Sequence, residues 1–218
     1  MGAFSALQNY YDVPLHVRAQ QLGYHESNIY ILLGDEQGLK LNYPDIYRNL
    51  VTCNHNRDNR TIMQYGQDVV ASWIFEDDLI EGLQDAGLTI SKSGADSGRL
   101  LLPSSRVSSG SDTRVCSDGR SRFMEIMCDY TGFWSRAHRA DLRDLKYNRL
   151  KSENALFLGI DVMNKQYTLI DFSGNVIVQY TPSHRAYGWK PAYSFNLTQY
   201  GLKAFDYEAI VDDIIAEF

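Results

Sequence analysis

The chain has 218 residues, of which 44% are hydrophobic and 22% charged, and its formal net charge is −6. This balance is typical of a globular protein and excludes a disordered chain. No segment approaches the ~18 consecutive apolar residues of a membrane helix, and no basic, apolar leader opens the sequence. We therefore expect a cytoplasmic protein without a membrane partner.

The length fits a single domain covering residues 1–218. Residues 1–65 are rich in Asn, Tyr and Asp and predict a peripheral lobe, whereas residues 67–180 carry clearer patterns and predict the core. Cys53, Cys116 and Cys128 lack the spacing of a zinc site or a disulfide framework.

Charge is unevenly distributed along the chain. Residues 99–150 contain ten Lys or Arg and six Asp or Glu, so this span is +4 while the remainder is −10. Because phosphates are contacted locally by Arg and Lys, the span could meet a nucleic acid. An ordinary Arg-rich surface is the alternative.

The first clear element is an amphipathic helix over about residues 67–86. Trp73, Glu76, Ile80 and Leu83 recur at helical spacing, and Gly87 follows where a left-handed cap would lie. Glu76 is the acid on its apolar face.

An antiparallel strand pair is expected next. Asp112–Cys116 forms one strand, Asp118-Gly119 the hairpin turn, and Arg122–Tyr130 the second strand. Alternation places Glu125 in mid-strand, on a face that it shares with Phe123, Met127 and Asp129.

The remaining elements predict an α/β fold with a central mixed sheet flanked by helices. We expect a helix over 141–150 that crosses to a buried strand at 155–161, followed by strands at 167–172 and 176–180 joined by Ser173-Gly174-Asn175. An aromatic and cationic loop is expected at 184–193. The last expected element is a helix over 206–218 with Ile210, Val211, Ile214 and Ile215 inward.

Asp112 and Glu125 could face each other across the hairpin. Two carboxylates of this kind can hold Mg²⁺ together with water and a substrate phosphate. Such an ion polarises the phosphoryl oxygen and activates water.

Together these elements and acids resemble the PD-(D/E)XK nuclease superfamily, over about residues 67–162. The resemblance implies a restriction-endonuclease-like core that cleaves DNA, with Asp112 and Glu125 as ligands of Mg²⁺ or Mn²⁺ and Glu76 as a further catalytic acid. It also implies duplex DNA as the substrate and a homodimer. Asp96 is a rival for the first ligand.

One position departs from that pattern. The family carries Lys, or sometimes Gln or Glu, two residues after the second acid, where this chain has Met127. Lys146, four residues after Leu142 and four before Leu150 and so on the inward face of its helix, could replace it. The candidate DNA contacts are Arg136, Arg139, Arg143 and Lys190.

Several structural alternatives stay open. Glu125 could be a buried acid paired with Arg114 or Arg122, Asp112 could merely end a loop, and Lys146 could lay its stem over Leu142 and Leu150. A non-catalytic module that binds nucleic acid or protein on the same fold is the rival function.

Two weaker constellations complete the candidates. Cys128, His138 and Asp141 are the residue types of thiol catalysis. His55, with Asn54, Asn56 and Asp58, faintly resembles an HNH-like metal site.

Overall fold

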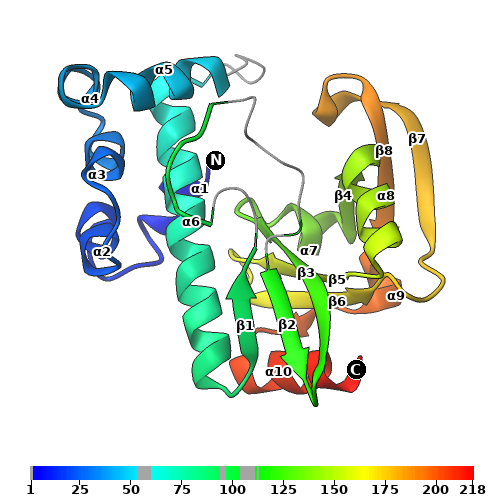
Figure 1. The fold of residues 1–218 in the computed structure, drawn as a ribbon. Helices are drawn as coiled ribbons and strands as arrows, with labels where there is room; N and C mark the ends of the chain where they lie inside the picture. The colour runs from blue at the N-terminus through cyan, green and yellow to red at the C-terminus, as the bar shows by residue number, and fades with distance from the viewer. Residues whose placement is uncertain (1, 54–59, 94–96, 104–110, 112) are drawn as a thin grey trace. The chain divides into compact units, whose positions relative to one another are not determined.

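The computed structural model describes residues 2–53, 60–93, 97–103, 111 and 113–218. The chain divides into two compact units, one comprising residues 1–79 and 95–108 and the other residues 80–94 and 109–218 (Figure 1). The predicted lobe of residues 1–65 lies in the first unit; the single domain stays a prediction. Within the described ranges, no helix combines the length and apolarity needed to cross a bilayer.

The first unit is built from helices. Leu39, Leu50 and Ile74 are fully buried in it, because each sits on the apolar stripe of an amphipathic helix. Its helices are α1 (Ala3–Leu7), α2 (Leu15–Gln21), α3 (Glu26–Leu33), α4 (Glu36–Asn42), α5 (Pro44–Cys53) and most of α6 (Ile62–Asp85). The predicted helix over 67–86 is confirmed as part of α6, and Gly87 follows it with a φ of +101°.

The second unit contains a central six-stranded sheet, in the order β1-β2-β3-β5-β6-β9. All neighbouring strands are antiparallel except β3 and β5, which run parallel. The predicted α/β fold with a mixed central sheet is therefore confirmed. Its strands are β1 (Thr89–Lys92), β2 (Thr113–Ser117), β3 (Arg120–Asp129), β5 (Leu156–Asp161), β6 (Gln166–Asp171) and β9 (Lys203–Ala204).

The hairpin between β2 and β3 forms as predicted. Asp118 and Gly119 both have positive φ, at +49° and +76°, which suits the tight turns that match the twist of paired strands. The register pairs Thr113 with Met124 and Arg114 with Phe123. Glu125 therefore lies at mid-strand, on the same face as Phe123 and Met127.

A second sheet was not foreseen. It has the order β4-β8-β7, with β4 (Arg139–Arg143), β7 (Val178–His184) and β8 (Lys190–Asn196). The helix predicted over 141–150 is thus wrong at its start, since α8 spans Asp144–Glu153 and the preceding residues form a strand. Ala140 and Leu142 alternate with charged residues and are buried by pairing with β8, which no local helical pattern reveals.

Three further predictions need correction. The loop predicted at 184–193 is a short 3-10 helix, η2 (Arg185–Tyr187), followed by β8. The strand predicted at 176–180 begins at Val178 and joins the second sheet instead of extending β6. In α10 (Tyr207–Ala216) Ile210, Val211 and Ile214 are buried as expected, but Ile215 is 43% exposed.

The predicted crossover is confirmed and carries extra elements. Between the parallel strands β3 and β5 the chain forms α7 (Phe133–Ala137), β4 and α8, and β5 is buried along its whole length. The remaining helix, α9 (Leu197–Tyr200), follows β8. A Cβ on Gly159 would lie 2.7 Å from the Trp134 ring, so this strand position requires glycine to let α7 pack closely.

One face of the central sheet packs into an apolar cluster with the second sheet. Phe157 and Ile170 from the central sheet meet Ala140, Leu142 and Phe195 there. The opposite face meets α10, where the Tyr167 hydroxyl donates to Asp213 at 2.7 Å. The face that carries Glu125 is therefore the one that the second sheet covers.

Arg122 ties four elements of this unit together. It pairs with Asp171 of β6, and its guanidinium donates to the carbonyls of Asn154 and Glu217, each at 2.8 Å. Burial raises the pKa of the Asp171 carboxyl, but hydrogen bonds from Arg122 and Ser173 hold it below its ordinary value overall.

We predict that Arg122→Met lowers the free energy of unfolding by about 2 kcal/mol at neutral pH, because several charge-assisted bonds are lost. A depressed carboxyl pKa adds stability that is fully present above the unfolded value of about 3.9 and is lost as pH falls through the lower, folded pKa. Urea unfolding from pH 7 down through the folded pKa of Asp171 should therefore show the difference between the variant and the wild type narrowing in acid. A constant difference would contradict the pairing.

Candidate active site

Glu125 is an acid placed in the interior of the second unit. It lies mid-way along β3 beside Phe157 of β5, and its side chain is only 8% exposed. A buried carboxylate needs a partner, since isolated charge is costly in an apolar environment. The flanking side chains on its face, Phe123 and Met127, are apolar and pack against the cluster beneath the second sheet.

That partner is Lys146 of α8. Its Nζ lies 2.6 Å from Oε1 of Glu125, and its side chain is 26% exposed. Neither Arg114 nor Arg122 takes this place: Arg122 pairs with Asp171, and Arg114 lies over the ring of Phe123. The predicted reach of Lys146 to Glu125 is thus present in the structure, and the Lys146 side chain is only partly buried.

Aromatic stacking fixes α8 in the position that Lys146 requires. Tyr147, the next residue, stacks on Tyr193 of β8 at 3.8 Å between ring centroids, and Leu150 is fully buried one turn later. Because residues four apart share a helix face, Lys146 and Leu150 point to the same side. The second sheet therefore holds the helix, and the helix presents Lys146 to β3.

Asp112 lies outside the described residues, but both of its neighbours in the chain are anchored. Ser111 is buried and donates through Oγ to Glu153 of α8 at 2.7 Å. Thr113 donates through Oγ1 to the carbonyl of Met124 at 2.9 Å. Ser111 is therefore tied to α8, and Thr113 is tied to the residue before Glu125.

Glu76 belongs to the first unit. Its Oε2 lies 3.2 Å from Nη1 of Arg99, a buried guanidinium that also pairs with Asp77. The sequence pattern gave no sign of this partner, because Arg99 lies in a segment without periodicity. The placement of Glu76 beside Glu125 stays a prediction.

As for a divalent cation, Glu125 offers the hard carboxylate oxygen that Mg²⁺ prefers. Within the described residues, no cluster of three or more His, Cys, Asp or Glu side chains suited to a metal is present. The donor chemistry of Glu125 fits an ion held by one or two carboxylates, with Asp112 as the candidate second ligand. The rival ligand Asp96 and the possible His55 site also fall outside the described residues.

The predicted DNA contacts gather largely on one surface. Arg139 and Arg143 of β4 and Lys190 of β8 share the outer face of the second sheet, by strand alternation and the β4–β8 register. All three are exposed, as is Arg136 on α7. This face turns away from the apolar cluster.

The sequence did not predict that Asp141, on that outer face, contacts several side chains. Asp141 accepts from Ser194 Oγ at 2.6 Å, lies 3.1 Å from Arg139 Nε, and lies 3.4 Å from His184 Nε2. Asp141 thus joins side chains from all three strands of the second sheet, and the thiol constellation with Cys128 and His138 stays a prediction. The alternation of charged and apolar residues over 139–143 was the available signal.

No family model matches the sequence, and no curated protein matches it. The function is therefore inferred from the residues and their geometry.

Proposed function

We propose that the protein is a metal-dependent endonuclease that hydrolyses phosphodiester bonds of duplex DNA at Glu125 and Lys146. The observation that carries the proposal is the 2.6 Å pair between Lys146 Nζ and Glu125 Oε1. It brings a cation to the acid from a neighbouring helix, although the strand itself carries Met127 at the expected lysine position.

The order of elements supports membership of the PD-(D/E)XK superfamily. A long helix, α6, precedes the antiparallel strands β1, β2 and β3, and a crossover containing α8 leads to β5, which is parallel to β3. Met127 is partly buried against the apolar cluster, so its side chain has a packing role. A catalytic lysine on α8 instead of β3 accounts for the apolar residue at position 127 and for the Lys146–Glu125 pair.

In this proposal Asp112 and Glu125 hold Mg²⁺ or Mn²⁺, which when bound polarises the scissile phosphate and lowers the pKa of a water molecule. Lys146 stabilises negative charge that develops on the phosphoryl oxygens. An ammonium has three donors, so one can remain on Glu125 while another turns toward the substrate. The partly exposed position of Lys146 leaves room for that contact.

Duplex DNA as the substrate is supported by the exposed cations Arg139, Arg143 and Lys190 on the outer face of the second sheet. Cleavage of both strands would be served by a homodimer, with one site for each strand. Such an enzyme would act on DNA in the cytoplasm.

One observation favours the rival binding module. Lys146 already neutralises Glu125, and a buried ion pair can be purely structural. In that case the outer face would still bind nucleic acid, but no divalent ion would promote cleavage.

We expect the wild type to nick or linearise supercoiled plasmid with Mg²⁺ or Mn²⁺, and EDTA to stop it. In Lys146→Met protein that circular dichroism shows to be folded, the cleavage rate should fall by about 100-fold or more with little change in DNA affinity, because a contact made in the transition state is lost. Lys146→Arg should restore little, since a planar guanidinium differs in shape and donors.

Lys151→Met is the matched control on the same helix. Lys151 donates to the carbonyl of Phe172 at 3.2 Å, away from Glu125, so this variant should cleave at the wild-type rate. Equal cleavage by Lys146→Met would remove Lys146 from the reaction. A wild type that cleaves no DNA with any divalent metal would favour the binding module.

DNA affinity should fall steeply with salt, because binding releases counterions from the phosphates. Arg143→Ala and Lys190→Ala should each weaken binding and reduce the salt slope by about 1. Fluorescence anisotropy on a labelled duplex, at salt concentrations from about 50 to 300 mM, measures the affinity and its salt slope. Arg48→Ala, which removes an exposed arginine of the first unit, should change neither. Unchanged slopes in both outer-face variants would make that face an ordinary surface.

A further inference from the structure

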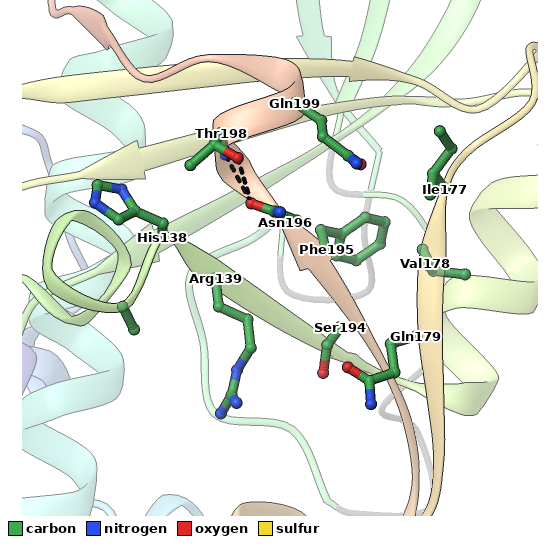
Figure 2. A pocket seen from close by; sticks show the side chains of 11 residues that line it. His138, Arg139, Ile177, Val178, Gln179, Ser194, Phe195, Asn196, Thr198 and Gln199 are labelled. Atoms are coloured by element: carbon green, nitrogen blue, oxygen red, sulfur yellow. Dashed lines mark hydrogen bonds between the residues drawn. The ribbon is translucent and has the colours of Figure 1, made fainter.

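A groove opens on the outer face of the second sheet, beside α9. Its volume is about 520 Å³, within the range of small-molecule sites. Figure 2 shows Arg139, Gln179, Ser194 and Asn196 along it, contributed by β4, β7 and β8. Ile177 adds an apolar wall and is 59% exposed.

Arg139 is held at this groove from two sides. Its Nε lies 3.1 Å from Asp141 Oδ1, its Nη2 donates to Asp141 Oδ2 at 3.3 Å, and its guanidinium lies over the Phe133 ring at 5.4 Å. Within the described part of the chain, Nη1 makes no hydrogen bond. An arginine fixed along one edge keeps its remaining donors available to a ligand at little entropic cost.

Asn196 adds a second oriented donor. Its Oδ1 accepts from the Thr198 backbone N at 3.1 Å and from Thr198 Oγ1 at 2.7 Å, as the dashed lines in Figure 2 show. Because this oxygen caps α9, the group that Asn196 can still offer is its Nδ2 amine. Ser194 Oγ donates to Asp141, so its hydrogen is already committed and the oriented donors that remain are those of Arg139 and Asn196.

We propose that this groove binds a phosphate ester, with the phosphate oxygens on Arg139 and Asn196 and the organic group against Ile177. Oriented N–H donors beside a cation are suited to a phosphate, and an exposed apolar side chain is suited to the group attached to it. The same chemistry is offered by a free nucleotide and by the backbone of a nucleic acid strand. The proposal is independent of cleavage at Glu125.

Calorimetry on the full chain tests it with thymidine 5′-monophosphate, inorganic phosphate and thymidine as probes. We expect the monophosphate to bind at least about tenfold more tightly than thymidine, which lacks the charge-assisted contacts. Competition with a short DNA duplex then shows whether the groove binds a free nucleotide or the backbone of a nucleic acid strand. Displacement of the monophosphate assigns the groove to the nucleic acid backbone, and retention assigns it to a free nucleotide.

Two variants locate the binding. Arg139→Met should weaken monophosphate binding by about tenfold or more. Asn196→Asp retains the oxygen that caps α9, since Asp is an equally good N-cap, but replaces the donor with negative charge and should weaken binding by a similar factor. Arg185→Ala, an exposed arginine on η2 outside the groove, is the control and should bind normally.

Circular dichroism confirms that each variant is folded. The proposal is overturned if neither thymidine 5′-monophosphate nor inorganic phosphate binds to the wild type at ligand concentrations up to ~10 mM, which is near the limit of meaningful affinity. Normal binding by folded Arg139→Met and Asn196→Asp would overturn it as well. Neither result depends on whether the protein cleaves DNA.

Discussion

The ion pair between Glu125 and Lys146 is the constraint on which the second unit depends. A carboxylate in mid-strand, beneath an apolar cluster, is tolerated because an ammonium meets it at 2.6 Å. Placing that ammonium requires α8 to lie beside β3. The stacking of Tyr147 on Tyr193 and the burial of Leu150 hold the helix there. The second sheet, which looks like an addition to the α/β core, is therefore what positions the candidate site.

The part of the site that the sequence predicts is the part controlled by local rules. The Asp118-Gly119 turn requires positive φ and so fixes the hairpin, and period-two alternation along β3 then determines the face of Glu125. The helical period likewise sets Lys146 on the side of Leu150. These rules act over a few residues and set the face that each side chain takes, and the packing of α8 against β8 then brings Lys146 to Glu125.

What the sequence does not reveal depends on distant pairing. Residues 139–143 can continue into the helix that follows, and only β8, some fifty residues later, turns them into a strand. The partners of Asp141 come from β4, β7 and β8, so its network is invisible to local patterns. Arg99 similarly meets Glu76 across 23 residues. Burial of charge is decided by such long-range partners, and composition does not identify them.

The central claim is that Glu125 contributes to a divalent-metal site. Crystals soaked in Mn²⁺ test it most directly, through anomalous diffraction from the ion. We expect an anomalous peak at about 2.0–2.2 Å from a Glu125 carboxylate oxygen, a distance typical of small divalent ions, and its loss in Glu125→Gln. A well-ordered Glu125–Lys146 pair with no Mn²⁺ beside it, or a peak that persists in Glu125→Gln, would contradict the claim.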